Sequence, residues 1–297
     1  MVQNKLNVFH WHLSDDQSFP LFLPSFPDFA ANAAYSKEQI YSTEDVADIV
    51  EYGRVRGIRV MPEIDTPSHV LSWRHLPVDI LTRCYDASGK PNGDLGPLDP
   101  SKEKTYKVME KIFHDLSSMF NDSYFHAGGD EVPLDCWRTN PNITKFRELL
   151  WEKKQSKKHQ SSDINQINQI NDSGNKVRVE DLVNFYSKQL MKAFRRSYGK
   201  ERSRMIMWEE AWENDPKVSK DIILHVWKNN QMTVKMLTDL GYQVLFSQCW
   251  YLNYISYGVD WPKYYLCDPT SMSPGGMSEF FFILFSFVSM IVIFFGN

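Results

Sequence analysis

The sequence predicts an α/β protein whose strands form a (β/α)8 (TIM) barrel, with about six of the eight βα units present. Short apolar runs alternate with longer amphipathic runs from residue 5 to residue 250, which is typical of parallel strands covered by helices. Polar residues follow the apolar runs, as in SDD, EIDTPSH, GGDE, WEE and WYLN. A barrel places its site at such strand ends, whereas an open doubly wound sheet gathers ligands around one switch point. Both observations favour the barrel.

The expected strands and helices follow one another regularly. Runs rich in β-branched and aromatic residues predict strands at 5–13, 58–65, 124–129, 204–210, 221–227 and 242–250. Apolar residues at helical spacing predict helices at 43–57, 101–120, 179–199 and 231–241. Thr43 is the candidate N-cap of the first helix, and Gly57 ends that helix. Because six strands are fewer than the eight of a complete barrel, we expect a truncated barrel with two open sheet edges.

Two segments interrupt this pattern, and they divide the chain into a partial barrel domain at 1–268 and a tail at 269–297. Residues 151–176 are polar, contain the near-repeat INQINQIN, and are interpreted as a surface insertion. The tail contains FFFILFSFVSMIVIFFG at 280–296, which has about the minimum length of a membrane span, roughly 17 residues. A transmembrane segment that anchors the chain fits this tail. A mispredicted or read-through chain end fits it as well.

Composition excludes several classes of protein. The 297 residues carry a formal net charge of −4 without a basic stripe, so we expect no nucleic-acid partner. Four cysteines without a CxxC pair argue against zinc ribbons and thioredoxin-like sites. Sequons at Asn121, Asn142 and Asn171, together with these cysteines, favour a secretory compartment. No signal peptide is visible at the N-terminus, which would fit a chain that begins partway through its domain.

The segment YFHAGGDEVPLDCW places two acids, Asp130 and Glu131, directly after a predicted strand. Consecutive side chains of a strand point to opposite faces, so the two acids can share a site only where the backbone turns. Gly128 and Gly129 give the chain the freedom to turn there. The alternative is structural, with Asp130 as a helix N-cap and Glu131 in the first turn, an arrangement that Pro133 also suits.

Several segments together decide between these interpretations. KLNVFHWHLSDDQSFP, EYGRVRGIRVMPEIDTPSHVLSW, HAGGDEVPLDCW, MWEEAW and WYLNYISYGVDW occur in this order from about residue 4 to residue 268. In these segments the chain resembles the glycoside hydrolase family 20 β-N-acetylhexosaminidases, especially the lysosomal enzymes of animals. The resemblance implies a barrel enzyme that needs no cofactor and no metal. Its expected substrates are glycans, glycoproteins or glycolipids ending in β-linked GlcNAc or GalNAc, and a lysosomal or secretory location and a homo- or heterodimer are also implied.

The resemblance also implies a mechanism in which the substrate takes part. In this family the 2-acetamido oxygen of the sugar attacks the anomeric carbon and forms an oxazolinium intermediate, with retention of configuration. The family is thus an exception to the two-carboxylate scheme of most glycosidases. Glu131 matches the general acid, which later activates water as the base. Asp130 matches the carboxylate that orients the acetamido nitrogen.

Further positions match family residues one by one. Asp15 and His69 match a hydrogen-bonded network behind the acid. Taken without the resemblance, His69 is more often a histidine near a helix N-cap than part of such a network. The other matches are the aromatic walls Trp208 and Trp227, the acetamido-oxygen ligand Tyr251, the hydroxyl ligand Asn253, and a family disulfide between Cys84 and Cys136. Taken singly, a tryptophan at a strand end is more often a packing residue.

The chain departs from the family pattern in four respects. Nothing before Lys5 supplies the arginine of the family's first strand, and the hydrophobic tail stands after Pro269 where the eighth strand with its Trp and Glu is expected. The family's small N-terminal domain has no counterpart. Tyr254 stands where some relatives carry an arginine for acidic headgroups. We therefore expect the chain to be poorly soluble and weakly active or inactive, with its catalytic pair intact.

Two other functions fit parts of the sequence. His10 and His12 form an H-x-H pattern on a strand, and two imidazoles on one face can bind zinc. A metal-dependent barrel hydrolase needs further ligands, for which His225 is a weak candidate. A truncated homologue that only binds sugar, or that is tethered to a membrane through 280–296, is the alternative without catalysis.

Overall fold

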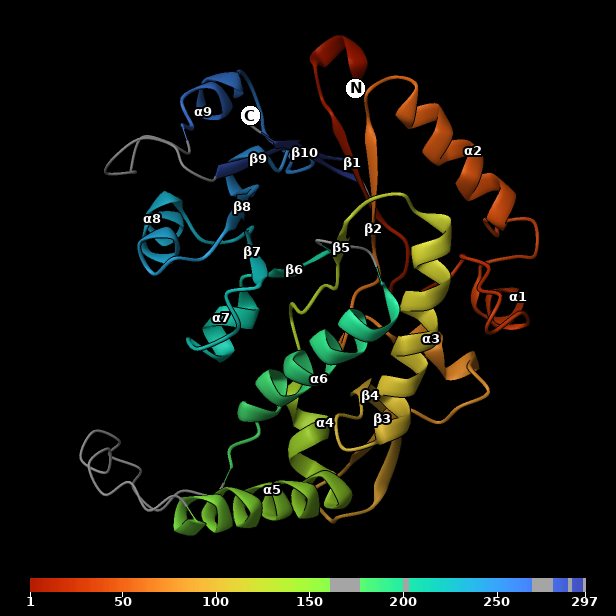
Figure 1. The fold of residues 1–297 in the computed structure, drawn as a ribbon, viewed down its shortest axis with the longest axis vertical. Coiled ribbons are helices and arrows are strands. Elements are labelled where there is room, and N and C mark those ends of the chain that lie inside the picture. The colour runs from red at the N-terminus through yellow and green to blue at the C-terminus, as the bar shows by residue number, and fades with distance from the viewer. Residues whose placement is uncertain (161–176, 200–202, 269–279, 288–289, 296–297) are drawn as a thin grey trace.

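The computed structural model describes residues 1–160, 177–199, 203–268, 280–287 and 290–295. Within these residues, eight strands form a closed barrel in the order β1–β10–β9–β8–β7–β6–β5–β2 (Figure 1). Six of them pair in parallel and confirm the predicted strands. They are β1 (Val8–His12), β2 (Arg59–Glu63), β5 (Tyr124–His126), β6 (Arg204–Trp208), β7 (Ile222–Val226) and β8 (Val244–Phe246).

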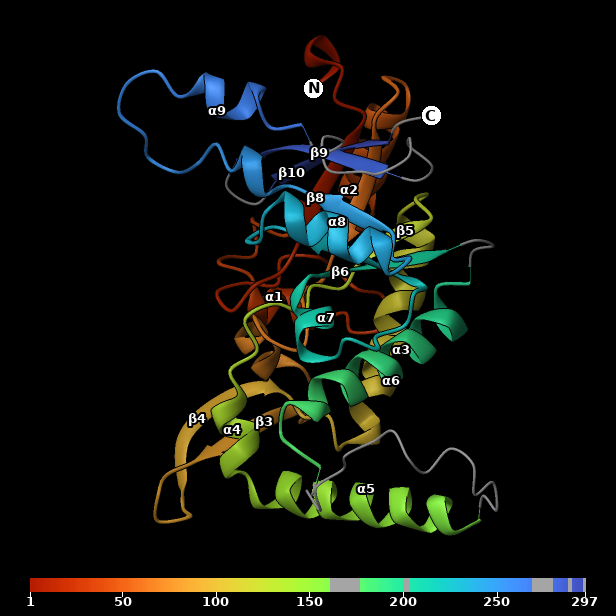
Figure 2. The same cartoon turned by 90° about the vertical axis from the view of Figure 1, so that its left-hand side faces the viewer.

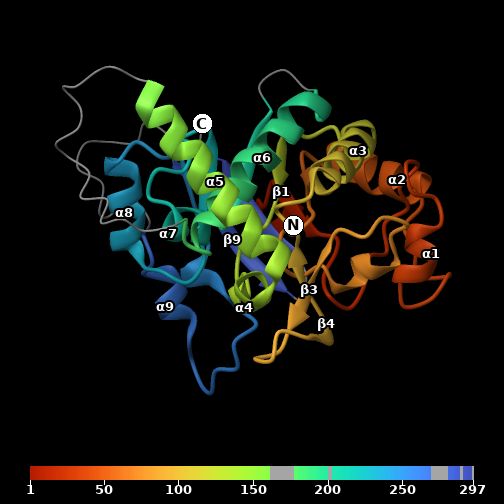
Figure 3. The ribbon, with the colours of Figure 1, turned by 90° about the horizontal axis from the view of Figure 1, so that it is seen from below.

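Helices cover the outside of these strands. The four predicted helices are confirmed as α2 (Thr43–Arg54), α3 (Glu103–Met119), α6 (Asp181–Ser197) and α8 (Gln231–Asp239). Helices α1 (Phe29–Ala33), α2 and α3 lie on one side of the strands, whereas α7 (Glu210–Asn214) and α8 lie on the other (Figures 1 and 3). Their apolar faces pack against the strands in one large buried cluster, which is the layered arrangement expected of alternating strands and helices.

The start of α2 differs from the prediction by one residue. Ser42, not Thr43, is the N-cap, because its hydroxyl accepts the backbone N–H of Asp45 at 3.1 Å. The Asp45 carboxylate in turn accepts the backbone N–H of Ser42 at 2.8 Å. These two bonds form a capping box, and Gly57 follows three residues after the last helical residue, Arg54.

A second group of elements lies outside the barrel. The hairpin of β3 (Leu81–Tyr85) and β4 (Pro91–Leu98) lies with α4 (Leu134–Thr139) and α5 (Pro141–Gln160) at the end of the molecule away from the N-terminus (Figure 2). Helix α9 (Trp261–Tyr265) follows β8. Residues 151–160 of the predicted polar insertion continue α5, so this part is helix. The remainder, 161–176, lies outside the described residues.

The tail corrects the prediction of open sheet edges. Residues 280–287 form β9 (Phe280–Phe287), which pairs in parallel with β8. Residues 290–295 form β10 (Met290–Phe295), which pairs antiparallel with β9 and with β1. The βα alternation therefore ends in a hairpin that closes the sheet. A continuous apolar run cannot be assigned to helix or strand by periodicity alone, which explains the error.

The segment predicted as a membrane span, 280–296, contains the strands β9 and β10. Among the residues that the structure describes, no helix combines the length and the apolar character needed to cross a membrane.

The interior of the barrel holds one apolar layer below the site. Strand residues alternate between the two faces of a sheet, so one residue of each of the six parallel strands β1, β2, β5, β6, β7 and β8 contributes to the layer. Five of these side chains form a buried cluster with Tyr124 packed against it, namely Val8, Met61, Ile206, Ile223 and Leu245. The six parallel strands continue past this layer by one to four residues, so the next inward position lies close to the C-terminal end of each strand.

Candidate active site

The turn after β5 brings the two acids to the same site. Gly128 has φ 69° and Gly129 has φ 104°, in the region that favours glycine. A Cβ atom at Gly128 would lie 1.5 Å from Oδ1 of Asp65, so no other residue fits there. Glu131 also has a positive φ, 48°, which is uncommon for a residue with a side chain and is typical of functional turns.

The structural alternative for these acids is wrong. Helix α4 begins at Leu134, and its N-cap is Pro133. Asp130 and Glu131 therefore precede the helix and do not cap it. The two acids lie outside the helix because the chain turns at Gly128 and Gly129, as predicted, and this turn places both carboxylates on a loop at the end of β5.

His69 lies among four carboxylates. Its Nε2 is 3.6 Å from Oε2 of Glu131, 3.8 Å from Oδ2 of Asp130 and 3.9 Å from Oδ2 of Asp65. Its Nδ1 is 3.4 Å from Oδ1 of Asp15. The structure thus brings together the four predicted residues that follow β1, β2 and β5, and it adds Asp65. The carboxylate of Glu131 is 59% exposed and faces solvent.

These contacts determine the charges of the site. The hydrogen bond with Asp15 raises the pKa of His69 to about 9, against the effect of partial burial, so the imidazole is a cation at neutral pH. Burial, followed by the charge of Glu63, raises the pKa of Asp130. Burial raises the pKa of Asp65 well above its usual range, and the neighbouring Asp130 adds to this. Burial and the neighbouring Asp130 thus both favour the neutral form of Asp65.

Aromatic rings form a wall beside the acids. The ring centroids of Trp208 and Trp227 are 6.2 Å apart with planes at 65°, and those of Trp227 and Tyr251 are 6.1 Å apart. These three predicted residues come from the ends of β6 and β7 and from the segment after β8. Asn253 is exposed two residues beyond Tyr251. Its predicted contact with sugar hydroxyls stays a prediction.

Two disulfides hold the loops around the site. Cys84 and Cys136 are bonded as the resemblance implies, and they join β3 to α4 directly after the acids. Cys249 and Cys267 form a second disulfide that the sequence left unpaired. It joins the 3-10 turn Gln248–Trp250 to the segment after α9.

Sequence reasoning missed three acids that the structure places at the site. Asp65 contacts the turn after β5, because its Oδ1 accepts the N–H of Gly129 at 3.0 Å. Glu63 accepts the indole N–H of Trp208 at 3.1 Å. Glu210 accepts the indole N–H of Trp227 at 3.1 Å. Their positions in EID and WEE at strand ends were the available signal.

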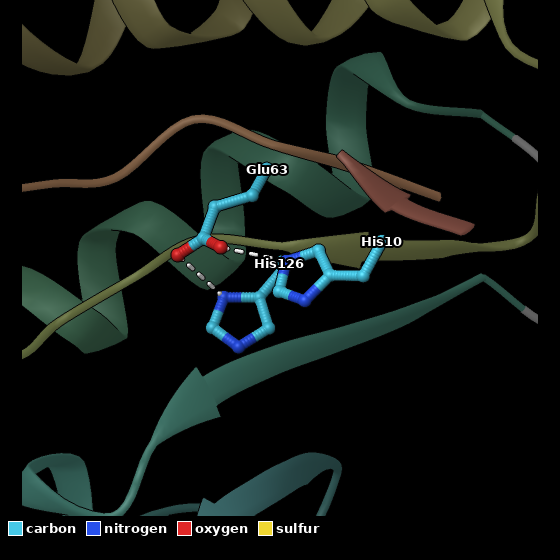
Figure 4. A group of neighbouring side chains, drawn as sticks. All are labelled: His10, Glu63 and His126. Carbon is cyan, nitrogen blue, oxygen red and sulfur yellow. Dashed lines mark ion pairs between the residues drawn. The ribbon is translucent and has the colours of Figure 1, made fainter. Parts of the chain in front are cut away.

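The H-x-H pattern places imidazoles in the barrel interior. His10 lies with Glu63 and His126 in a buried group whose ion pairs are drawn in Figure 4. His10 Nε2 is 2.6 Å from Oε2 of Glu63, and His126 Nδ1 is 3.0 Å from its Oε1. Two ligands of one tetrahedral ion lie roughly 3.3 Å apart when each bond is about 2.0–2.1 Å. The His10–Glu63 contact is shorter than this ligand spacing.

A (β/α) barrel carries its functional residues at the C-terminal ends of its strands, which is where this chain gathers acids and aromatic rings. The sequence model described as "Glycosyl hydrolase family 20, catalytic domain" matches residues 1–273. The chain therefore belongs to glycosyl hydrolase family 20.

Individual relatives agree with this assignment. The chain is 38% identical over 276 residues to the beta-hexosaminidase subunit alpha of Bos taurus, a match that covers 91% of the chain and 47% of the relative. It is 36% identical over 271 residues to the human beta-hexosaminidase subunit beta, covering 91% and 44%. The chain thus spans about half the length of these curated relatives.

Solved structures show the same fold. The chitobiase of Flavobacterium johnsoniae matches with a TM-score of 0.63 and 27% identity, covering 84% of this chain and 34% of that one. An exo-β-N-acetylglucosaminidase of Vibrio harveyi, solved with N-acetylglucosamine, matches with a TM-score of 0.67 and 24% identity, covering 92% and 43%.

Proposed function

We propose that this protein is a retaining exo-glycosidase that releases terminal, non-reducing β-linked N-acetylhexosamine by substrate-assisted catalysis. The observation that carries the proposal is the grouping of Asp130 and Glu131 around one imidazole. Because His69 Nε2 lies within 3.8 Å of both carboxylates, the two acids are on one side of the site. A double-displacement glycosidase instead places its two carboxylates on either side of the bond to be cleaved.

The geometry supports a division of labour between the two acids. The exposed Glu131 protonates the glycosidic oxygen as the acetamido oxygen of the substrate attacks the anomeric carbon and the bond to the leaving group breaks. The buried Asp130 accepts the acetamido N–H and balances the positive charge that develops on the oxazolinium ring. Glu131 then takes a proton from water, which opens the ring and returns the enzyme to its starting state.

The cation His69 supports this sequence of events electrostatically. As Glu131 loses its proton, the imidazolium 3.6 Å away stabilises the carboxylate that forms. Asp15 keeps the imidazole protonated and oriented. The rings of Trp208, Trp227 and Tyr251 would enclose the N-acetyl group, whose methyl group needs an apolar surface.

The test is hydrolysis of a chromogenic N-acetyl-β-glucosaminide by the chain and by single variants. Glu131→Gln should lower kcat about 100- to 10,000-fold, as expected for loss of a general acid. Asp135→Asn is the control, since this exposed acid pairs with Arg138 in the same segment and should leave kcat unchanged. The matching glucoside, which lacks the acetamido group, should not be hydrolysed. Equal turnover of both substrates would contradict the participation of that group.

The alternative without catalysis is sugar binding by an inactive homologue. It predicts that glycans bind without turnover and that Glu131→Gln changes nothing. The size of the measured kcat also tests the expectation of weak activity for the 297-residue chain.

Location and assembly are part of the same proposal. Two disulfides support a lysosomal or secretory compartment. The similar bovine and human proteins are named as subunits, which supports a homo- or heterodimer. Light scattering of the purified protein measures that assembly directly.

A further inference from the structure

A second layer of inward-facing residues lies between the apolar layer and the site. Each of the six parallel strands contributes the residue two positions beyond its apolar one, since every second residue faces the interior. This layer is polar, unlike the one below it, and consists of His10, Glu63, His126, Trp208, His225 and Ser247. The mechanism proposed above uses only Trp208 of this layer.

Glu63 is the centre of the polar layer. Its side chain is fully buried and contacts His10 Nε2 at 2.6 Å and His126 Nδ1 at 3.0 Å (Figure 4). The same Oε1 atom that faces His126 accepts the indole N–H of Trp208 at 3.1 Å. A carboxylate buried this deeply persists only where such partners replace water.

One partner of Glu63, His126 on β5, is held in turn by His225 on β7. His126 Nε2 lies 3.1 Å from His225 Nδ1, and His225 Nε2 lies 3.0 Å from Oγ of Ser247. Together with the contacts of Glu63, these two hydrogen bonds form a line of polar contacts across the barrel interior from β1 and β2 to the end of β8. It restricts the carboxylate of Glu63 to one position.

The indole of Trp208 is positioned by the same groups. Its ring stacks on His225 with centroids 4.1 Å apart and planes at 29°, and His126 approaches to 4.5 Å. Stacking limits the ring to one plane but leaves it free to slide and turn within that plane. The hydrogen bond to Glu63 removes this freedom.

We propose that Glu63 is a positioning residue that fixes the indole of Trp208 and thereby sets the size of the N-acyl pocket. The inference rests on the proposed function, in which Trp208 forms one wall of that pocket. What matters is the reach of the Glu63 side chain, because the acceptor oxygen must meet the indole N–H. Its negative charge is not required for this contact.

Two substitutions separate reach from charge. Glu63→Gln keeps an oxygen acceptor at the same length and removes the charge. Glu63→Asp keeps the charge and withdraws the oxygens by one methylene group. Asp115→Asn is the matched control. Asp115 is another buried acid outside the polar layer, and its carboxylate accepts hydrogen bonds from the backbone N–H and the hydroxyl of Ser25.

The measurement compares kcat/KM for chromogenic substrates that carry an N-acetyl or an N-propanoyl group, using the full chain. We expect Glu63→Gln and Asp115→Asn to keep the wild-type preference for N-acetyl within threefold. Glu63→Asp should reduce that preference about tenfold, because a displaced indole admits the extra methylene. In NMR spectra, the indole N–H resonance of Trp208, assigned by its absence in Trp208→Phe, should shift in Glu63→Asp alone.

The reverse pattern overturns the inference. If Glu63→Gln lost the N-acetyl preference and shifted the indole resonance while Glu63→Asp kept both, charge rather than reach would be the property that matters. An unchanged preference in both variants would likewise overturn it. Failure of the proposed function is a different result: the wild-type chain would then cleave neither substrate. In that case the indole resonance of Trp208 would still show whether Glu63 positions this ring.

Discussion

Removing the carboxylate of Asp15 tests the electrostatic account of the site. In the folded protein this group lies 3.4 Å from Nδ1 of His69 and is the largest cause of the rise in the pKa of His69 to about 9. Asp15→Asn preserves the size of the side chain and removes its charge. The pKa of His69 should therefore fall towards its usual value of 6.5.

The expected loss of stability follows from that change. A pKa of about 9 instead of 6.5 corresponds to roughly 3.4 kcal/mol, at about 1.36 kcal/mol per pKa unit. Asp15 is 46% exposed and His69 is 23% exposed, so solvent screens much of this interaction. Asp130 and Asp16 also contribute to the raised pKa. We therefore expect Asp15→Asn to lower the free energy of unfolding by about 1 kcal/mol.

The pH dependence has a definite sign. The folded-state pKa of His69 lies above the unfolded-state value, so its stabilisation is fully present below about pH 6.5 and is lost as the pH rises through about 9. At pH 5.5 Asp15 stays ionised: burial raises its pKa, but the hydrogen bond with His69 leaves it below its ordinary value. The difference between wild type and variant should therefore be largest at pH 5.5–6.5 and vanish near pH 10.

Urea denaturation of both proteins between pH 5.5 and pH 10 measures this difference. NMR titration of the His69 ring gives its pKa directly. A difference in unfolding free energy that does not change with pH would refute the reasoning, as would a pKa of His69 near 6.5 in the wild type.

Two further predictions concern the loops around the acids. Cys84 and Cys136 close a loop across a sequence separation of 52 residues, so replacing both by serine should destabilise the protein by about 4 kcal/mol. Thermal denaturation would show this as a Tm lower by roughly 10 °C, and an unchanged Tm would contradict it. Asp65→Asn keeps a neutral donor towards Asp130 and should keep kcat within threefold, whereas Asp65→Ala should lower kcat about 10- to 100-fold. Similar losses in both variants would mean that Asp65 acts as an anion.

The sequence alone predicted the barrel, its six parallel strands and the four long helices that cover it. Apolar periodicity is a local property, and it needs no knowledge of neighbouring elements. The turn at Gly128 and Gly129 was equally local, since adjacent acids can share a site only where the backbone departs from a strand. The roles of Asp130 and Glu131 came from the resemblance, which the family assignment supports.

The tertiary structure alone decided which side chains meet. Asp65 and Glu63 lie two residues apart in the sequence, yet Asp65 contacts the turn after β5 and Glu63 contacts the indole of Trp208. Closure of the barrel by 280–287 and 290–295 likewise depends on pairing with β8 and β1. Local patterns specify which face of an element is apolar, but contacts between strands far apart in the sequence form only when the barrel brings their ends together.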